Sequence, residues 1–253
     1  MKRNDLPRYE PERWLVAGFR VCECRKPVTD RRSSKLVQAR AGKHPAAWLR
    51  LGTVFLIACL FAVSCATTKP GDLVEVKKLI PNVVLDIRYA TTNNFTGQKL
   101  YESNRTFLRR AVAEKLRAAQ REFNRAGVGL KIYDAYRPIS VQKKMWAIFP
   151  QEGYVANPAK GSRHNRGAAV DVTLIDLRDK KELLMPSGYD EFSEKARRNY
   201  MNAPEEAIRN RELLERVMKK HGFTGLPTEW WHFDDVNWRN YELLDIDSAR
   251  LKY

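Results

Sequence analysis

The spacing of apolar residues along the chain predicts two long amphipathic helices, over 105–126 and 204–221. In both stretches apolar side chains recur every three or four positions, which places them on one helical face. These side chains are Leu108, Ala111, Val112, Leu116, Ala119 and Phe123 in the first stretch, and Ala207, Ile208, Leu214, Val217 and Met218 in the second. Gly127 and Gly222 follow directly and are typical helix stops. A shorter apolar stretch predicts a third helix over 141–149.

Three other stretches, over 83–88, 130–134 and 168–174, predict β-strands. In the last of them, three apolar residues alternate with Asp171 and Thr173. Because successive side chains of a strand point to opposite faces, Asp171 is directed away from the apolar face and toward a cleft. Helices and strands do not alternate strictly enough for a doubly wound sheet. The sequence therefore predicts one α+β domain, with helices packed on a mainly antiparallel sheet.

An uncharged apolar run of 16 residues, Leu51–Ala66, follows the basic residues Lys43 and Arg50. The run is shorter than the roughly 20 residues of a membrane-spanning helix. A basic flank, a compact apolar core and small residues before a cleavage point are typical of an export signal. Its end, Ala-Val-Ser-Cys, resembles a bacterial lipoprotein signal, in which Cys65 carries the lipid. The alternatives are an uncleaved anchor and a secretory signal that is cut near Ala66.

The chain thus divides into four predicted segments. Residues 1–48 are a basic segment, either a disordered extension or a stretch ahead of the true translation start. Residues 49–65 are the lipoprotein-type signal, 66–72 a polar linker and 73–253 the folded domain. We therefore expect an exported protein of the bacterial cell envelope, on its periplasmic or outer-surface side. A lipid anchor or the apolar segment would attach it to the membrane.

The charge of the chain raises the question of a nucleic-acid partner. The 253 residues are 43% hydrophobic and have a formal net charge of +16. The first 65 residues contain 13 Lys and Arg against 5 Asp and Glu, and the other 188 contain 33 against 25. Half of the excess therefore lies outside the predicted domain. Because no zinc-finger, helix-turn-helix or RNA-binding pattern is present, we expect no nucleic-acid partner.

All four cysteines, Cys22, Cys24, Cys59 and Cys65, precede the predicted domain. The domain therefore contains neither a disulfide nor a thiolate metal ligand. Any metal site in it must use histidine and carboxylate side chains.

Two short stretches hold two of the chain's four histidines beside two carboxylates. They are Ser-Arg-His-Asn-Arg-Gly-Ala-Ala-Val-Asp over 162–171 and Glu-Trp-Trp-His over 229–232. A catalytic zinc ion needs three protein ligands and one open position, and His164, Asp171 and His232 would provide the ligands. Glu229 would stay uncoordinated and transfer a proton from the attacking water to the leaving amine. Either motif alone is equally compatible with interior histidines, but the two together indicate a hydrolase with one Zn²⁺ per chain.

These motifs resemble those of the zinc D-alanyl-D-alanine peptidases, the group that also contains the metal-binding domain of hedgehog proteins. Two further stretches indicate the D-alanyl-D-alanine dipeptidase branch, which includes vancomycin-resistance enzymes. They are Asp-Ile-Arg-Tyr-Ala-Thr-Thr-Asn-Asn-Phe-Thr-Gly over 86–97 and Tyr-Asp-Ala-Tyr-Arg-Pro over 133–138. The resemblance extends over residues 73–237. It implies a hedgehog/D,D-peptidase-like fold with a zinc cleft, and hydrolysis of D-Ala-D-Ala in cell-wall peptide metabolism.

The resemblance also implies roles for single residues. The zinc ligands of the family match the three residues named above, and its catalytic glutamate matches Glu229. Arg137 matches the arginine that steadies the tetrahedral intermediate. A guanidinium suits this role, because it is always charged and presents several donors to an oxyanion. The alternative for Arg137 is a surface salt bridge with Asp134.

A dipeptidase must hold both free ends of its substrate, whereas a carboxypeptidase holds only the carboxylate end. In the resemblance, Tyr89 and Asp190 match residues near the substrate amine, and Ser162 matches a hydroxyl near the substrate. The segment between Arg137 and His164 is short compared with resistance-type enzymes, so we expect a substrate-covering loop to be reduced or absent. Two alternatives stay open. They are a D,D- or L,D-carboxypeptidase that trims wall peptides, and a lipid-anchored binding module without turnover.

Overall fold

The computed structural model describes residues 72–251. The strands are β1 (Leu73–Glu75), β2 (Val84–Leu85), β3 (Phe107–Arg109), β4 (Val128–Asp134), β5 (Ala169–Asp176), β6 (Phe223–Leu226) and β7 (Glu229–Asp235). The α-helices are α1 (Val76–Leu79), α2 (Arg110–Arg125), α3 (Ile139–Ile148) and α4 (Glu205–Lys220). Five short 3-10 helices are η1 (Arg88–Ala90), η2 (His164–Arg166), η3 (Glu194–Ala196), η4 (Trp238–Asn240) and η5 (Ser248–Arg250). The predicted segments 1–48 and 49–65, with Cys65, lie outside the described residues.

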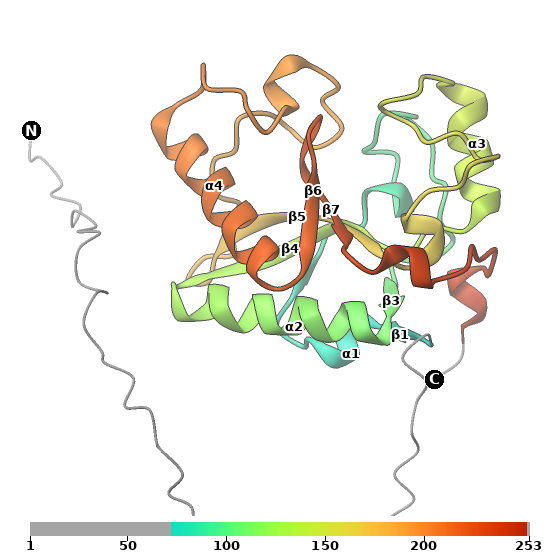
Figure 1. Ribbon diagram of the computed structural model, residues 1–253, viewed down its shortest axis with the longest axis horizontal. Helices are drawn as coiled ribbons and strands as arrows, with labels where there is room; N and C mark the ends of the chain where they lie inside the picture. The colour runs from blue at the N-terminus through green and yellow to red at the C-terminus, as the bar shows by residue number, and fades with distance from the viewer. Residues whose placement is uncertain (1–71, 252–253) are drawn as a thin grey trace, which may run out of the picture. The chain divides into compact units, whose positions relative to one another are not determined.

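A five-stranded sheet with the order β2-β4-β5-β7-β6 is the centre of the described chain. β2 runs parallel to β4, and every other neighbouring pair in this sheet is antiparallel. β1 and β3 form a separate antiparallel pair. Figure 1 shows α2 along one side of the sheet, with α4 and α3 at opposite sides of the view. The predicted α+β class with a mainly antiparallel sheet is confirmed.

The two long helices have the predicted apolar faces. α2 buries Leu116 and Phe123 completely, and α4 buries Leu214 and Met218 completely. α2 begins five residues later than predicted, because the chain at Phe107–Arg109 pairs with β1 as strand β3. Tertiary pairing here overrides a helical pattern that extends further back in the sequence. Within residues 72–251, no helix is both long and apolar enough to cross a membrane.

The strand predicted over 83–88 is much shorter than expected. Only Val84 and Leu85 pair with β4, and Asp86 donates one further backbone hydrogen bond to Ile132. The chain then turns into η1, which carries Tyr89. This turn directs the Tyr89 side chain into the interior, where it is 2% exposed.

A register shift interrupts the pairing of β6 with β7. Gly225 pairs with Phe233, whereas the next residue, Leu226, pairs with Glu229. Such a shift inserts extra residues into one strand and changes where their side chains point. Glu229 and His232 are three residues apart and would face opposite sides of a regular strand, yet both line one cavity. The register shift therefore allows both side chains to reach the same cavity.

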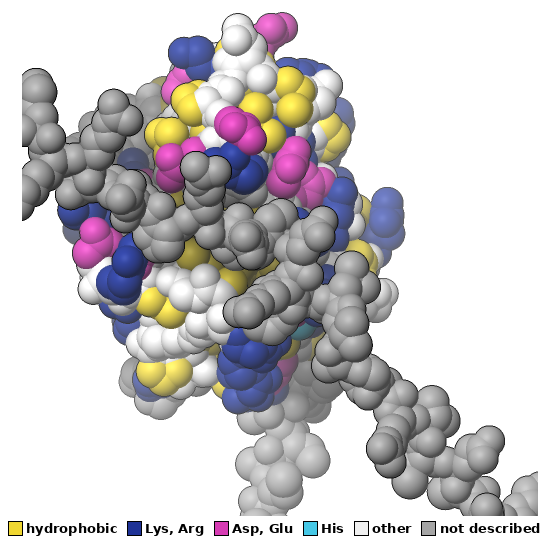
Figure 2. Space-filling view, turned by 90° about the vertical axis from the view of Figure 1, so that its left-hand side faces the viewer, with side chains coloured by type: hydrophobic (Ala, Val, Ile, Leu, Met, Phe, Trp, Pro, Cys, Tyr) yellow, Lys and Arg dark blue, Asp and Glu magenta, His cyan; other side chains and the backbone are white. Residues whose placement is uncertain are grey.

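Surface charges on the described residues are mixed in sign. On α4, Arg209 pairs with Glu205 and Lys219 pairs with Glu215, each one helical turn apart. The face of the molecule in Figure 2 likewise carries Lys and Arg together with Asp and Glu. The absence of a nucleic-acid partner stays a prediction.

Candidate active site

A cavity of about 300 Å³ is lined by residues from β5, β7, η1, η2 and the segment 152–163. Its volume is at the lower end of the range for small-molecule sites, which is roughly 300 to 1,000 Å³. All eight site residues that the sequence predicted within the domain line it, namely Tyr89, Arg137, Ser162, His164, Asp171, Asp190, Glu229 and His232. The segment between Arg137 and His164 also forms part of the wall. The prediction of a reduced or absent covering loop, made relative to resistance-type enzymes, stays a prediction.

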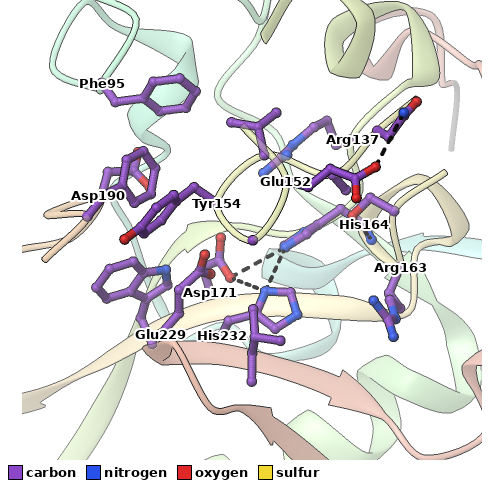
Figure 3. Close-up of a pocket in the computed structure, with 18 of the residues that line it drawn as sticks. Phe95, Arg137, Glu152, Tyr154, Arg163, His164, Asp171, Asp190, Glu229 and His232 are labelled. Carbon is purple, nitrogen blue, oxygen red and sulfur yellow. Dashed lines mark hydrogen bonds and ion pairs between the residues drawn. The ribbon is translucent and has the colours of Figure 1, made fainter. Parts of the chain in front are cut away.

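Three side chains of the cavity converge on one point: His164 from η2, Asp171 from β5 and His232 from β7 (Figure 3). The antiparallel register places Asp171 directly opposite His232. His164 Nε2 lies 3.2 Å from His232 Nδ1 and 3.4 Å from Asp171 Oδ1, and His232 Nδ1 lies 3.0 Å from the same oxygen. Tetrahedral zinc with bonds of about 2.0–2.1 Å separates its ligand atoms by roughly 3.3 Å. The three atoms therefore already have the spacing of zinc ligands.

The outer nitrogens of both imidazoles have hydrogen-bond acceptors. His164 Nδ1 donates to the carbonyl oxygen of Ala135 at 2.6 Å, and His232 Nε2 lies 2.9 Å from Asp234 Oδ1. In a neutral ring the proton is then on the outer nitrogen, and the inner nitrogen keeps its lone pair. Two lone pairs and the Asp171 carboxylate that face one another are suited to hold a cation between them. Two nitrogens and one oxygen suit Zn²⁺ and leave its fourth position open.

Burial and negative charge shift the titration of the acids in the cavity. Burial raises the pKa of Glu229 to about 7 and that of Asp190 well above its ordinary value, and the charge on Asp171 adds to both shifts. Burial disfavours a charged His232, but Asp234 and Asp171 outweigh it and raise the His232 pKa to about 10. Burial likewise opposes charge on Asp171, yet the two imidazoles lower its pKa. Protons and a metal ion therefore compete for this site.

Arg137 follows β4 and lines the cavity with a side chain that is held on two sides. Its Nε and Nη2 donate to Asp134 Oδ2 at 3.0 and 2.6 Å, and its Nη1 donates to Gln142 Oε1 at 2.8 Å. The predicted pair with Asp134 exists, but it is buried and not on the surface, since Asp134 is fully inaccessible and Arg137 is 8% exposed. These bonds use three of the five guanidinium N–H groups and fix the plane of the group.

Tyr89 and Asp190 meet in the cavity, although 100 residues separate them in the sequence. The Tyr89 hydroxyl donates to Asp190 Oδ2 at 2.9 Å. Asp190 has a left-handed backbone with φ of 57°, a conformation that is uncommon for residues other than glycine. Ser162 lies elsewhere on the wall, and its hydroxyl accepts the backbone N–H of His164 at 3.2 Å. Ser162 therefore shapes the turn that carries a metal-binding histidine.

A protein-family model described as D-ala-D-ala dipeptidase matches residues 69–243. The chain belongs to this family. The D-alanyl-D-alanine dipeptidase of Escherichia coli (strain K12) is 36% identical over 177 residues, which cover 68% of this chain and 89% of the relative. The D-alanyl-D-alanine dipeptidase of Enterococcus faecalis (strain ATCC 700802 / V583) is 32% identical over 179 residues, which cover 62% of this chain and 87% of the relative.

Two solved structures of vancomycin-resistance enzymes are similar at lower identity. The D,D-dipeptidase VanXYg in complex with a D-Ala-D-Ala phosphinate analogue is 20% identical, with a TM-score of 0.33, and the match covers 52% of this chain and 51% of that chain. A D,D-pentapeptidase VanY in complex with Zn(II) is 17% identical, with a TM-score of 0.32, and the match covers 55% and 78%. Membership of the D-ala-D-ala dipeptidase family confirms the predicted hydrolase class.

Three residues that contact side chains of this dipeptidase-family cavity were not identified from the sequence. Asp234 orients His232, and Gln142 holds Arg137. The hydroxyl of Tyr189 donates to Asp171 Oδ2 at 3.1 Å. Asp234 follows its partner by two positions in a strand, so period-two spacing could have identified it. Tyr189 lies in an irregular segment without periodicity, and only the tertiary structure reveals its contact.

Proposed function

We propose that the protein is a zinc-dependent dipeptidase that hydrolyses D-alanyl-D-alanine to two D-alanines in bacterial cell-wall peptide metabolism. One observation carries this proposal. The same small cavity contains the metal-binding group with Glu229 and, in addition, the Tyr89–Asp190 pair that can accept a free ammonium. Membership of the D-ala-D-ala dipeptidase family supports it.

Substrate recognition depends on Asp190. Asp190 is partly buried, and its desolvation and the charges of Asp171 and Glu229 disfavour its ionised form. A substrate ammonium supplies the cation that this carboxylate lacks, so the free amine and Asp190 stabilise one another. Tyr89 fixes the carboxylate by donating to Oδ2. A substrate with a blocked amine would leave Asp190 without its charge partner.

Proton transfer depends on Glu229. Burial places its pKa near neutral pH, where a carboxylate can both accept and release a proton. Glu229 takes a proton from the attacking water and delivers it to the leaving amine. The Arg137 guanidinium, held by Asp134 and Gln142, donates to the oxyanion of the tetrahedral intermediate. His164, Asp171 and His232 would hold Zn²⁺, which would supply Lewis acidity and lower the pKa of the bound water.

The substrate's free amine provides the test. The full-length protein with Zn²⁺ is assayed on D-Ala-D-Ala, on N-acetyl-D-Ala-D-Ala, on L-Ala-L-Ala and on a wall pentapeptide. We expect kcat/KM for D-Ala-D-Ala to exceed that for the acetylated form by about 10-fold to 100-fold, because acetylation leaves a buried acceptor without its partner, which costs roughly 1–3 kcal/mol. In Asp190→Asn the difference should shrink through loss on the free dipeptide.

Glu191→Gln is the matched control, since Glu191 is the exposed neighbour of Asp190 and does not line the cavity. It should keep the wild-type preference. Equal kcat/KM for the free and the acetylated dipeptide in the wild type would reject the dipeptidase assignment. That result would favour a carboxypeptidase with the same metal chemistry.

We propose further that the protein is exported to the cell envelope and is lipidated at Cys65. The support is the sequence of residues 49–65, in which small residues before Cys65 follow an apolar core. Radiolabelled fatty acid supplied to an expressing bacterium should label the protein, and Cys65→Ser should abolish the label. A label that persists in Cys65→Ser, or its absence in the parent, would favour an uncleaved anchor or a secreted enzyme.

A further inference from the structure

Tyr189 contacts Asp171 of the metal-binding group, and aromatic rings from three elements surround its side chain. Its ring packs against Tyr133 of β4 with centroids 4.5 Å apart. It meets Trp231 of β7 edge-on at 5.4 Å and Tyr89 of η1 edge-on at 6.4 Å. A ring with three such neighbours has little freedom to rotate. The position of its hydroxyl is therefore set by the fold.

The two oxygens of the Asp171 carboxylate have different partners. Oδ1 of Asp171 faces the inner nitrogens of His164 and His232, at 3.4 and 3.0 Å. Oδ2 accepts the Tyr189 hydroxyl at 3.1 Å. A carboxylate whose second oxygen were free could turn and offer both oxygens to one metal ion. The fourth position, which a catalytic site keeps for water, would then be filled by protein.

The Tyr189 hydroxyl has one proton, and the Asp171 carboxylate can only accept it. The hydrogen bond therefore occupies Oδ2 and holds the carboxylate plane in one orientation. Outer partners of this kind orient metal ligands and affect metal affinity strongly.

We propose that Tyr189 is a positioning residue that holds the Asp171 carboxylate in one-oxygen coordination to the bound metal ion. This inference rests on the metal site of the proposed function, and it adds a residue that does not itself touch the metal. Tyr189 also precedes Asp190, the proposed acceptor of the substrate amine. One dipeptide therefore supplies both the hydroxyl that contacts Asp171 and the Asp190 carboxylate that lines the cavity, and Asp190 has a left-handed backbone.

The test is Tyr189→Phe in the full-length protein, because phenylalanine keeps the ring and its three aromatic neighbours and removes only the hydroxyl. Two quantities are measured: the Zn²⁺ dissociation constant, by competition with a chromophoric chelator, and the visible absorption spectrum of the Co²⁺-loaded protein. We expect zinc affinity about 10-fold to 100-fold weaker than in the wild type. The Co²⁺ spectrum should change, because it reports ligand number and geometry.

Tyr133→Phe is the matched control. Tyr133 packs on the same ring and is the more buried of the two, but its hydroxyl interacts with Glu182 and not with Asp171. It should keep wild-type zinc affinity and the wild-type Co²⁺ spectrum. If Tyr189→Phe also keeps both, the positioning role is wrong while the dipeptidase proposal stands. If the wild type itself binds no stoichiometric Zn²⁺, both proposals are wrong.

Discussion

Glu229 shows how a single buried side chain can be prepared for proton transfer. The carboxyl group is 7% exposed, and burial is the main cause that raises its pKa to about 7. His232, Arg137 and Arg198 act in the opposite direction and prevent a larger shift. A base is most effective when its pKa is close to the working pH, so these opposing effects suit the proposed role.

Replacement of this base should separate metal binding from turnover. In Glu229→Ala we expect stoichiometric zinc but kcat lower by about 100-fold to 10,000-fold, because in the proposed mechanism Glu229 serves both proton transfers and is not a ligand. Metal analysis and steady-state kinetics on the same preparation provide the two measurements. A variant with bound zinc and wild-type kcat would show that another group is the base.

The same carboxyl group predicts the pH dependence of the reaction. Glu229 must be ionised to accept a proton, so activity is lost as the pH falls through its pKa. Burial places that pKa at about 7 in the metal-free protein, and a bound cation nearby favours the ionised form. We therefore expect kcat/KM on D-Ala-D-Ala to decline below a pKa that is lower than about 7, by about tenfold per pH unit on the acid side. A kcat/KM that stays constant from about pH 7 down to about pH 4, below the ordinary pKa of a glutamate, would contradict this role.

At the scale of elements, the β6–β7 hairpin depends on one arginine. Arg198 Nε donates to the carbonyl oxygen of Leu226 at 2.9 Å, and its Nη2 donates to that of His232 at 2.5 Å. The guanidinium lies directly over Gly225, where an added Cβ would be 2.2 Å from Arg198 Cζ. The side chain thus bridges the register shift that brings Glu229 and His232 into one cavity, and only glycine leaves room for it.

Gly225→Ala should therefore displace Arg198 and loosen the hairpin. We expect a loss of about 1–3 kcal/mol in the free energy of unfolding, which is typical of overpacking, together with weaker zinc binding. Denaturant unfolding and chelator competition measure the two effects. Gly188→Ala is the matched control for stability, because its nearest neighbour would be 3.8 Å from the added Cβ. Wild-type stability in Gly225→Ala would show that Arg198 can move aside at no cost.

At the scale of the whole domain, metal binding joins elements that are distant in sequence. His164 lies in η2, Asp171 in β5 and His232 in β7, so one ion would cross-link three elements. Without the ion, these three side chains are linked only by hydrogen bonds and ion pairs. A ligand that binds only the folded state stabilises it by about 2.7 kcal/mol when present at 100 times its dissociation constant.

Zinc removal should therefore lower the thermal stability of the domain. We expect a chelator to decrease Tm by about 5–10 °C and added Zn²⁺ to restore it, since 1 kcal/mol corresponds to about 2–4 °C in domains of this size. His164→Ala, Asp171→Ala and His232→Ala should each lose zinc, activity and the response to chelator. His221→Ala is the control, because His221 contacts Glu122 of α2 and does not line the cavity. If one of these three alanine variants keeps full zinc occupancy, the replaced residue is not a zinc ligand.

The sequence by itself determined the residue types of the proposed site. His164, Asp171, His232 and Glu229 could be proposed because a zinc hydrolase needs these residue types, and short motifs keep them close along the chain. The apolar faces of α2 and α4 were equally readable, because a helix repeats its pattern over many turns. Short motifs and helical periodicity involve residues that are close along the chain, so both can be identified from the sequence alone.

Only the tertiary structure decided the contacts between distant segments. The start of α2 depends on the pairing of β3 with β1. The length of β2 depends on its pairing with β4, which includes only Val84 and Leu85. The contact of Tyr189 with Asp171 and the position of Arg198 over Gly225 arise from packing across the sheet. No local pattern encodes such contacts, because their energy comes from residues that meet only when the sheet has formed.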